Sequence, residues 1–184
     1  MSEVLEELID RLAYIHVQPK RFLLLGNFPA EAVKRIWTLY PKAESVLVNH
    51  IEPKPIWKFL RRSQTQVFTL PLPWPAFHFD VILSSNFCES FETLFPLLQE
   101  FARILSPQGM LMFTTERMTQ DMHDLGDDLL KLGFENPVMD TEWFQDKKQE
   151  VIFGHAWGVK VPRGITQADG SVKVPLHHLS KTRK

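Results

Sequence analysis

The residues best placed to orient a ligand stand at the end of one apolar segment, FDVILSS, residues 79–85. Ser84 and Ser85 end this segment and Asn86 follows it. In open α/β sheets ligands bind beyond the carboxyl ends of parallel strands, so these hydroxyl and amide groups could position a substrate. The sequence contains no Ser-His-Asp, Cys-His or phosphate-loop pattern. The chemistry that these residues predict is therefore positioning, with little acid–base help.

A second group of polar residues lies in the segment DMHDLGDD, residues 121–128. Carboxylate and imidazole groups so close in sequence suggest a metal site as one interpretation. The alternative, which we favour, is that acids stabilise the N-terminus of a helix through its macrodipole. We therefore expect no metal at this segment.

His155 and Cys88 are two further side chains with reactive chemistry. His155 lies in GHAWG beside Trp157, in a segment typical of a strand. We favour a packed, hydrogen-bonded structural histidine there over a catalytic base, because buried polar groups usually serve structure. Cys88 is the only cysteine of the chain, which excludes a disulfide framework and a thiolate metal cluster. We interpret it as an ordinary thiol.

The segment RFLLLGNFPAEA, residues 21–32, is typical of the first strand and turn of a nucleotide-binding α/β fold. Its turn contains the single glycine Gly26, followed by Asn27, Phe28 and Pro29. Glycines in such turns let the backbone approach a ligand closely. The segment therefore raises the question of what a turn with one glycine still binds.

Hydrophobic periodicity predicts helices alternating with short apolar strands along most of the chain. We expect helices over residues 3–16, with Ser2 as N-cap, and over 33–40, 57–63, 91–105 and 121–132. The expected strands are 22–25, 45–49, 66–70, 79–85 and 110–115, with SPQG, residues 106–109, as a turn, and a final hairpin of 137–144 and 150–161. This order predicts an α/β doubly wound sheet, mostly parallel with a C-terminal antiparallel hairpin, and helices on both faces.

The composition fits one soluble domain over residues 1–158, followed by a basic tail over 159–184. The chain has 184 residues and a formal net charge of -1, which argues against a nucleic-acid-binding surface over the whole protein. The acidic N-terminus and the lack of a long apolar run predict a cytoplasmic protein without a membrane partner. For the tail we favour a flexible, solvated end, while nucleic acid or an acidic carrier protein stay open as partners.

Several stretches together resemble the malonyl-acyl-carrier-protein O-methyltransferases of biotin synthesis, the BioC family of class I S-adenosylmethionine-dependent methyltransferases. The similar stretches are LIDRLAYIHVQPKRFLLLG, FDVILSSN, LLQEFARILSPQGMLMFTT, DMHDLGDDLLKLGFENPVMD and EVIFGHAWG. The resemblance implies a Rossmann-like methyltransferase sheet with S-adenosylmethionine as its cofactor. It also implies that Ser84 and Ser85 lie near the reacting methyl group.

The cofactor positions that the resemblance implies carry unexpected residues. The acid of the first strand falls on Leu24, the glycines of the turn fall on Gly26, Phe28 and Ala30, and the acid that receives the ribose falls on His50. Leucine cannot accept a hydrogen bond from the methionine amino group, and a histidine cannot accept two hydroxyl protons as a carboxylate can. Segments of the family between Thr115 and Asp121, between Phe144 and Val151, and before residue 3 are also expected to be shortened or missing.

From these departures we expect a protein that has lost S-adenosylmethionine binding or binds it weakly. Its role would be non-catalytic, through interaction with an active methyltransferase or an acyl carrier protein. The alternative is an active S-adenosylmethionine-dependent methyltransferase acting on malonyl-acyl-carrier protein or another small carboxylic acid.

Overall fold

The computed structural model describes residues 2–48, 70–85, 91–116, 121–145, 148–159, 165–166 and 172–173. The described elements are α1 (Glu3–Tyr14), β1 (Arg21–Gly26), α2 (Ala30–Leu39), β2 (Glu44–Val48), β3 (Phe79–Ser85), α3 (Phe91–Ile104), β4 (Leu105–Glu116), α4 (Met122–Lys131), β5 (Glu135–Phe144), β6 (Gln149–Trp157), β7 (Ile165–Thr166) and β8 (Val172–Lys173). The short strands β7 and β8 pair with each other. The predicted helix 57–63, most of the predicted strand 66–70 and most of the basic tail lie outside the described residues.

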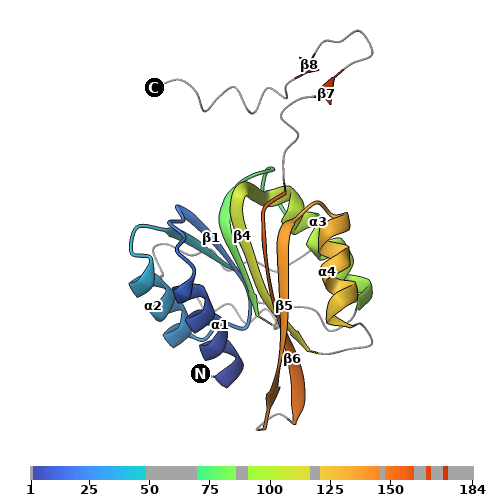
Figure 1. The fold of residues 1–184 in the computed structure, drawn as a ribbon. Coiled ribbons are helices and arrows are strands. Elements are labelled where there is room, and N and C mark those ends of the chain that lie inside the picture. Colours follow the sequence, from blue (N-terminus) through green and yellow to red (C-terminus); the bar gives the residue numbers. More distant parts are fainter. Residues whose placement is uncertain are drawn as a thin grey trace.

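The main sheet has six described strands in the order β2-β1-β3-β4-β6-β5. Strands β2, β1, β3 and β4 pair in parallel, whereas β6 is antiparallel to both of its neighbours (Figure 1). The predicted fold class, a mostly parallel sheet that ends in an antiparallel hairpin, is confirmed.

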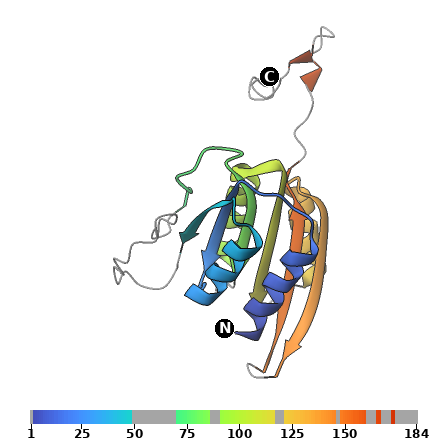
Figure 2. The same ribbon diagram turned by 90° about the vertical axis from the view of Figure 1, so that its left-hand side faces the viewer.

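Helices cover both faces of this sheet and divide its core into two layers. One layer joins α1 and α2 to residues of β1, β3, β4 and β6, and the other joins α3 and α4 to the alternate residues of the same strands. Figure 2 shows α1 and α2 side by side on one face. Because successive strand residues point to opposite faces, a strand covered on both sides is apolar throughout, as residues 22–25 are.

The N-terminal helix begins and ends near the predicted residues. The Ser2 hydroxyl accepts a hydrogen bond from the backbone N–H of Leu5 at 3.4 Å, as expected of an N-cap. Helix α4 ends at Lys131, close to the predicted residue 132, and Gly133 adopts a φ of +88° directly after the last turn.

The segment SPQG differs from its prediction as a simple turn, because it lies within the bounds of β4. Leu105 pairs with Phe79, but the next pair joins Met110 to Val81, so β4 bulges between these two points. Gly109 lies in the bulge, where a Cβ would approach the carbonyl oxygen of Asp80 at 2.8 Å. Close packing against β3 therefore keeps the segment extended where a free turn was expected.

The proline-rich connection that precedes β3 is irregular, and α3 holds it in place. Glu100 accepts a hydrogen bond from the N–H of Leu72 at 2.8 Å, and Arg103 donates to the carbonyl oxygens of Leu72 and Trp74 at 2.9 and 2.7 Å. The bond from Arg103 holds the pKa of Glu100 below its usual range. No helix in the described part of the chain is long and apolar enough to cross a membrane.

Candidate ligand site at the carboxyl edge of the sheet

The strand register brings several of the predicted site residues to one edge of the sheet. Gly26 pairs with Ser85, and Ser85 pairs with Thr114 on the next strand. Ser84 precedes them on β3, at the same edge. His50 follows β2 by two residues and lies outside the described residues.

Gly26 is required here by the packing of the sheet. Its φ is +111°, and a Cβ at this position would overlap the carbonyl oxygen of Ser85. Any side chain would therefore push β1 away from β3, whether or not a ligand is bound. The one glycine kept in the turn is thus explained by strand packing alone.

Two of the positions at which the resemblance implies other residues, Leu24 and Phe28, belong to the apolar core. Leu24 is completely buried and Phe28 is 4% exposed, and both pack in the layer formed with α1 and α2. The N–H of Phe28 donates to the carbonyl oxygen of Gly26 at 3.1 Å, and Pro29 has no N–H. Ala30 is exposed as the first residue of α2. The turn thus keeps few groups that could bind a polar cofactor.

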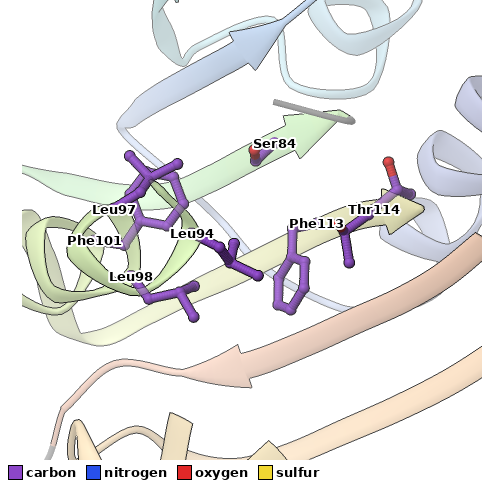
Figure 3. A pocket seen from close by; sticks show the side chains of 8 residues that line it. Ser84, Leu94, Leu97, Leu98, Phe101, Phe113 and Thr114 are labelled. Carbon is purple, nitrogen blue, oxygen red and sulfur yellow. The ribbon is translucent and has the colours of Figure 1, made fainter. Parts of the chain in front are cut away.

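Buried hydroxyl groups lie at the ends of β3 and β4. Ser84, Thr114 and Thr115 are all buried. A cavity of about 10 Å³ lies between these strand ends and α3 (Figure 3); it is lined by Ser84, Leu94, Leu97, Leu98, Phe101, Phe113, Thr114 and Thr115. A cavity of this volume holds roughly one water molecule.

Thr114 and Thr115 were missed as site residues by the sequence analysis. Both stand directly after the buried run of β4, as Ser84 and Ser85 do in β3. The signal that could have found them is this shared pattern of polar residues at the carboxyl ends of adjacent parallel strands.

The acidic segment at the start of α4 spreads its side chains in solvent. Asp121, His123, Asp124 and Asp127 are exposed. Asp128 is buried and accepts an ion pair from Lys131 at 2.9 Å. Among the described residues, no three His, Cys, Asp or Glu side chains gather in a group that could hold a metal ion.

His155 differs in part from its prediction as a hydrogen-bonded structural histidine. Its side chain is half-buried on β6, but within the described residues neither ring nitrogen has a hydrogen-bond partner. Burial and the nearby Arg11 lower the pKa of His155. It lines a cavity of about 480 Å³ between α1 and the strands β4, β5 and β6, away from the carboxyl-edge residues.

Comparisons with known proteins relate this chain to methyltransferases. Residues 31–113 match the family described as methyltransferase domain. A malonyl-[acyl-carrier protein] O-methyltransferase of Halorhodospira halophila is 29% identical over 77% of this chain and 57% of its own length. The corresponding protein of Legionella pneumophila is also 29% identical, over 77% of this chain and 59% of its own length. The chain thus spans about three fifths of the length of these relatives.

Solved structures share the fold at low sequence identity. A 1,6-didemethyltoxoflavin-N1-methyltransferase of Burkholderia thailandensis, solved with S-adenosylhomocysteine, has a TM-score of 0.64 and 15% identity, covering 85% of this chain and 77% of its own. The [4+2]-cyclase SpnF has a TM-score of 0.65 and 12% identity, covering 85% of this chain and 81% of its own. Proteins named for different reactions therefore share this fold, so the reaction of a given chain has to be argued from its site.

Proposed function

Because this chain is a methyltransferase-fold protein related to malonyl-[acyl-carrier protein] O-methyltransferases, we propose that it binds S-adenosylmethionine weakly or not at all and acts without catalysis. The observation that carries the proposal is the burial of Leu24 and Phe28 in the apolar core. These are the positions at which the resemblance implies a carboxylate and a glycine.

Burial of these two side chains removes binding groups and leaves little room to restore them. The amino group of S-adenosylmethionine needs an acceptor, which Leu24 lacks. A carboxylate at the same place would be surrounded by α1 and α2 side chains and would lose its hydration without an evident partner. The turn is stabilised as part of the core, and that stabilisation competes with cofactor binding.

Two further findings support the proposal. The match to the methyltransferase family begins at residue 31, directly after the turn. Among the described residues, the cavity beside Ser84 measures about 10 Å³, whereas pockets for small molecules commonly measure roughly 300–1,000 Å³.

In this proposal the protein works through an interaction, with an active methyltransferase or an acyl carrier protein as partner, in the cytoplasm. The competing function is an active methyltransferase that acts on malonyl-acyl-carrier protein or another small carboxylic acid. The names of the relatives and the buried hydroxyls of Ser84, Thr114 and Thr115 favour it. Methyl transfer to a carboxylate needs positioned groups of this kind and no strong base.

Calorimetric titration with S-adenosylmethionine and with S-adenosylhomocysteine separates the two functions. We expect no binding heat with either compound at millimolar concentration. Binding in the micromolar range would overturn the proposal and favour the active enzyme. The matched variant Phe28→Gly reports on the turn itself, because measurable affinity in this variant alone would identify the Phe28 ring as the group that excludes the cofactor.

A partner is tested separately by size-exclusion chromatography of the protein mixed with malonyl-loaded acyl carrier protein. Co-elution of the two supports an interaction role. Independent elution, also after addition of an active malonyl-acyl-carrier-protein O-methyltransferase, would contradict both partners that we propose.

A further inference from the structure

A groove lies between α1 and the strands at the antiparallel edge of the sheet. Figure 2 shows α1 and α2 on this face, with β5 and β6 extending beyond α1. The groove encloses about 480 Å³ and is lined by Leu8, Arg11, Tyr14, Ile15, Met112, Val138, Met139, Asp140, Phe153, Gly154 and His155. We call it the α1–β6 groove. It shares no lining residue with the cavity beside Ser84.

The floor of the α1–β6 groove is apolar and its rim exposes large apolar side chains. Leu8, Met112 and Phe153 are buried beneath it. At the rim, Tyr14 is 84% exposed and Val138 is 50% exposed. Exposed apolar groups on both walls of a cavity of this volume are typical of a surface that binds a ligand.

One polar group in the groove is available to a ligand. His155 lies opposite Met112 on β4 and Val138 on β5, so its ring stands among apolar neighbours. Within the described residues its ring makes no hydrogen bond. Its lowered pKa keeps the imidazole neutral near pH 7, with one nitrogen able to donate and the other to accept.

The charges beside the groove favour a cation. The guanidinium of Arg11 bonds to Glu7, Asp140 and Glu142 at 2.7, 3.0 and 3.2 Å and lies 4.2 Å from the centre of the Phe153 ring. Three carboxylates around one guanidinium leave two negative charges in excess. Because Arg11 already has three anionic partners, an added anion would meet net repulsion and an added cation would meet attraction.

We propose that the α1–β6 groove binds an organic cation with an apolar or aromatic body. The body packs on Met112 and Val138 and stacks against the exposed ring of Tyr14, and the cationic group lies beside Asp140. This site is independent of the carboxyl-edge residues, so it can exist whether or not S-adenosylmethionine binds.

The experiment uses three probes with one ring and different charges: benzyltrimethylammonium, benzyl alcohol and benzoate. Each probe is titrated into the full-length, ¹⁵N-labelled protein and followed by its amide resonances. We expect benzyltrimethylammonium to shift resonances of β5, β6 and the end of α1, and to bind about tenfold more tightly than benzyl alcohol, with benzoate weakest. Equal affinity for all three probes, or shifts confined to other elements, would overturn the proposal.

Two matched variants on β5 locate the site. Val138→Arg places a cation in the groove, and we expect it to weaken benzyltrimethylammonium binding by about tenfold. Trp143→Arg makes the same kind of change at a residue that is 57% exposed on the opposite face of the same strand. Unchanged binding in Val138→Arg, or equal loss in both variants, would contradict the assigned site. Thermal melting of both variants, each altered at an exposed position, shows whether they remain folded.

Discussion

At the carboxyl edge of the sheet, Leu24 and Phe28 are buried in the core and the nearby cavity measures about 10 Å³. In the α1–β6 groove, His155, Arg11 and Asp140 line about 480 Å³, and Glu7 and Glu142 bond to Arg11 beside it. Among the described residues, the edge at which a protein of this fold is expected to bind its ligand thus carries buried apolar and hydroxyl side chains around a small cavity, while a face without an expected role has a larger, charged groove.

This difference shows that the residues that let the strands pack and the residues that bind a ligand are determined separately. Gly26 is required by the close approach of the Ser85 backbone, whether or not a ligand is bound. Leu24 and Phe28 have no such backbone constraint, and they contribute to packing. A motif residue that strand packing alone explains is therefore weak evidence that this chain binds the ligand that the motif binds in other proteins.

The largest expected effect tests whether the carboxyl edge can still accept a charge. Leu24→Asp buries a carboxylate among apolar side chains and should lower the free energy of unfolding by about 3–5 kcal/mol. Leu39→Asp, at a residue 41% exposed at the end of α2, is the matched control and should have a small effect. Urea unfolding measures both. Near-equal stability of Leu24→Asp and the wild type, with a gain of S-adenosylmethionine binding, would show that the edge is still a polar site.

The second test compares two glycines. Gly26→Ala brings a Cβ against the carbonyl oxygen of Ser85 at a positive φ and should lower the free energy of unfolding by about 2–4 kcal/mol. In Gly126→Ala, on α4, the new Cβ would lie 3.9 Å from the nearest atom, in Met139, so stability should rise by about 1 kcal/mol. Thermal melting distinguishes the two. A harmless Gly26→Ala would mean that the glycine is not required by packing.

Most of the fold could be predicted from the sequence because local signals and tertiary packing agree. The run at residues 22–25 is apolar on both faces, and Ser2 and Gly133 mark helix ends through their backbone chemistry. The prediction for the segment SPQG was wrong because the conformation of Gly109 and its neighbours depends on their packing against Asp80 of β3. No local sequence pattern reveals this contact.

The candidate sites were harder to predict because they depend on which strands become neighbours. Thr114 joins Ser85 only through the pairing of β3 and β4. The α1–β6 groove joins Tyr14 to His155 across more than a hundred residues, and no period or spacing in the sequence relates them. His155 was recognised as a residue of interest, but its lack of a hydrogen-bond partner among the described residues is visible only in the fold.

A smaller effect is expected from the charge of Arg11. Arg11→Met keeps an apolar cover over Phe153 but breaks the contacts with Glu7, Asp140 and Glu142, and should lower the free energy of unfolding by about 1 kcal/mol. Because the carboxylates remain, affinity for benzyltrimethylammonium should rise. Calorimetric titration and thermal melting measure the two effects. Weaker binding would mean that Arg11 holds the groove open or contacts the ligand, against the charge argument.

The smallest expected effect concerns the protonation of His155. Its pKa is lowered by burial and by Arg11, so it gains its proton only below its ordinary value near 6.5. The charged groups facing it are Arg11 from α1 and Asp140 from β5, while β4 contributes the neutral Met112. A fall in pH below 6.5 therefore adds positive charge at His155 in the groove and should weaken benzyltrimethylammonium binding by about threefold.

The pH effect can be assigned by comparing two histidines. His155→Gln should remove it, because the variant has no imidazole to take up a proton in the groove. His78→Gln is the matched control: burial and Arg21 lower the pKa of His78 as well, but it lies at the amino end of β3, outside the groove. Titrations at pH 5.5 and 7.5 make the comparison. If the His155→Gln variant kept the wild-type pH dependence, a group other than His155 would cause it. The preference of the groove for a cation would then rest on the carboxylates around Arg11 alone.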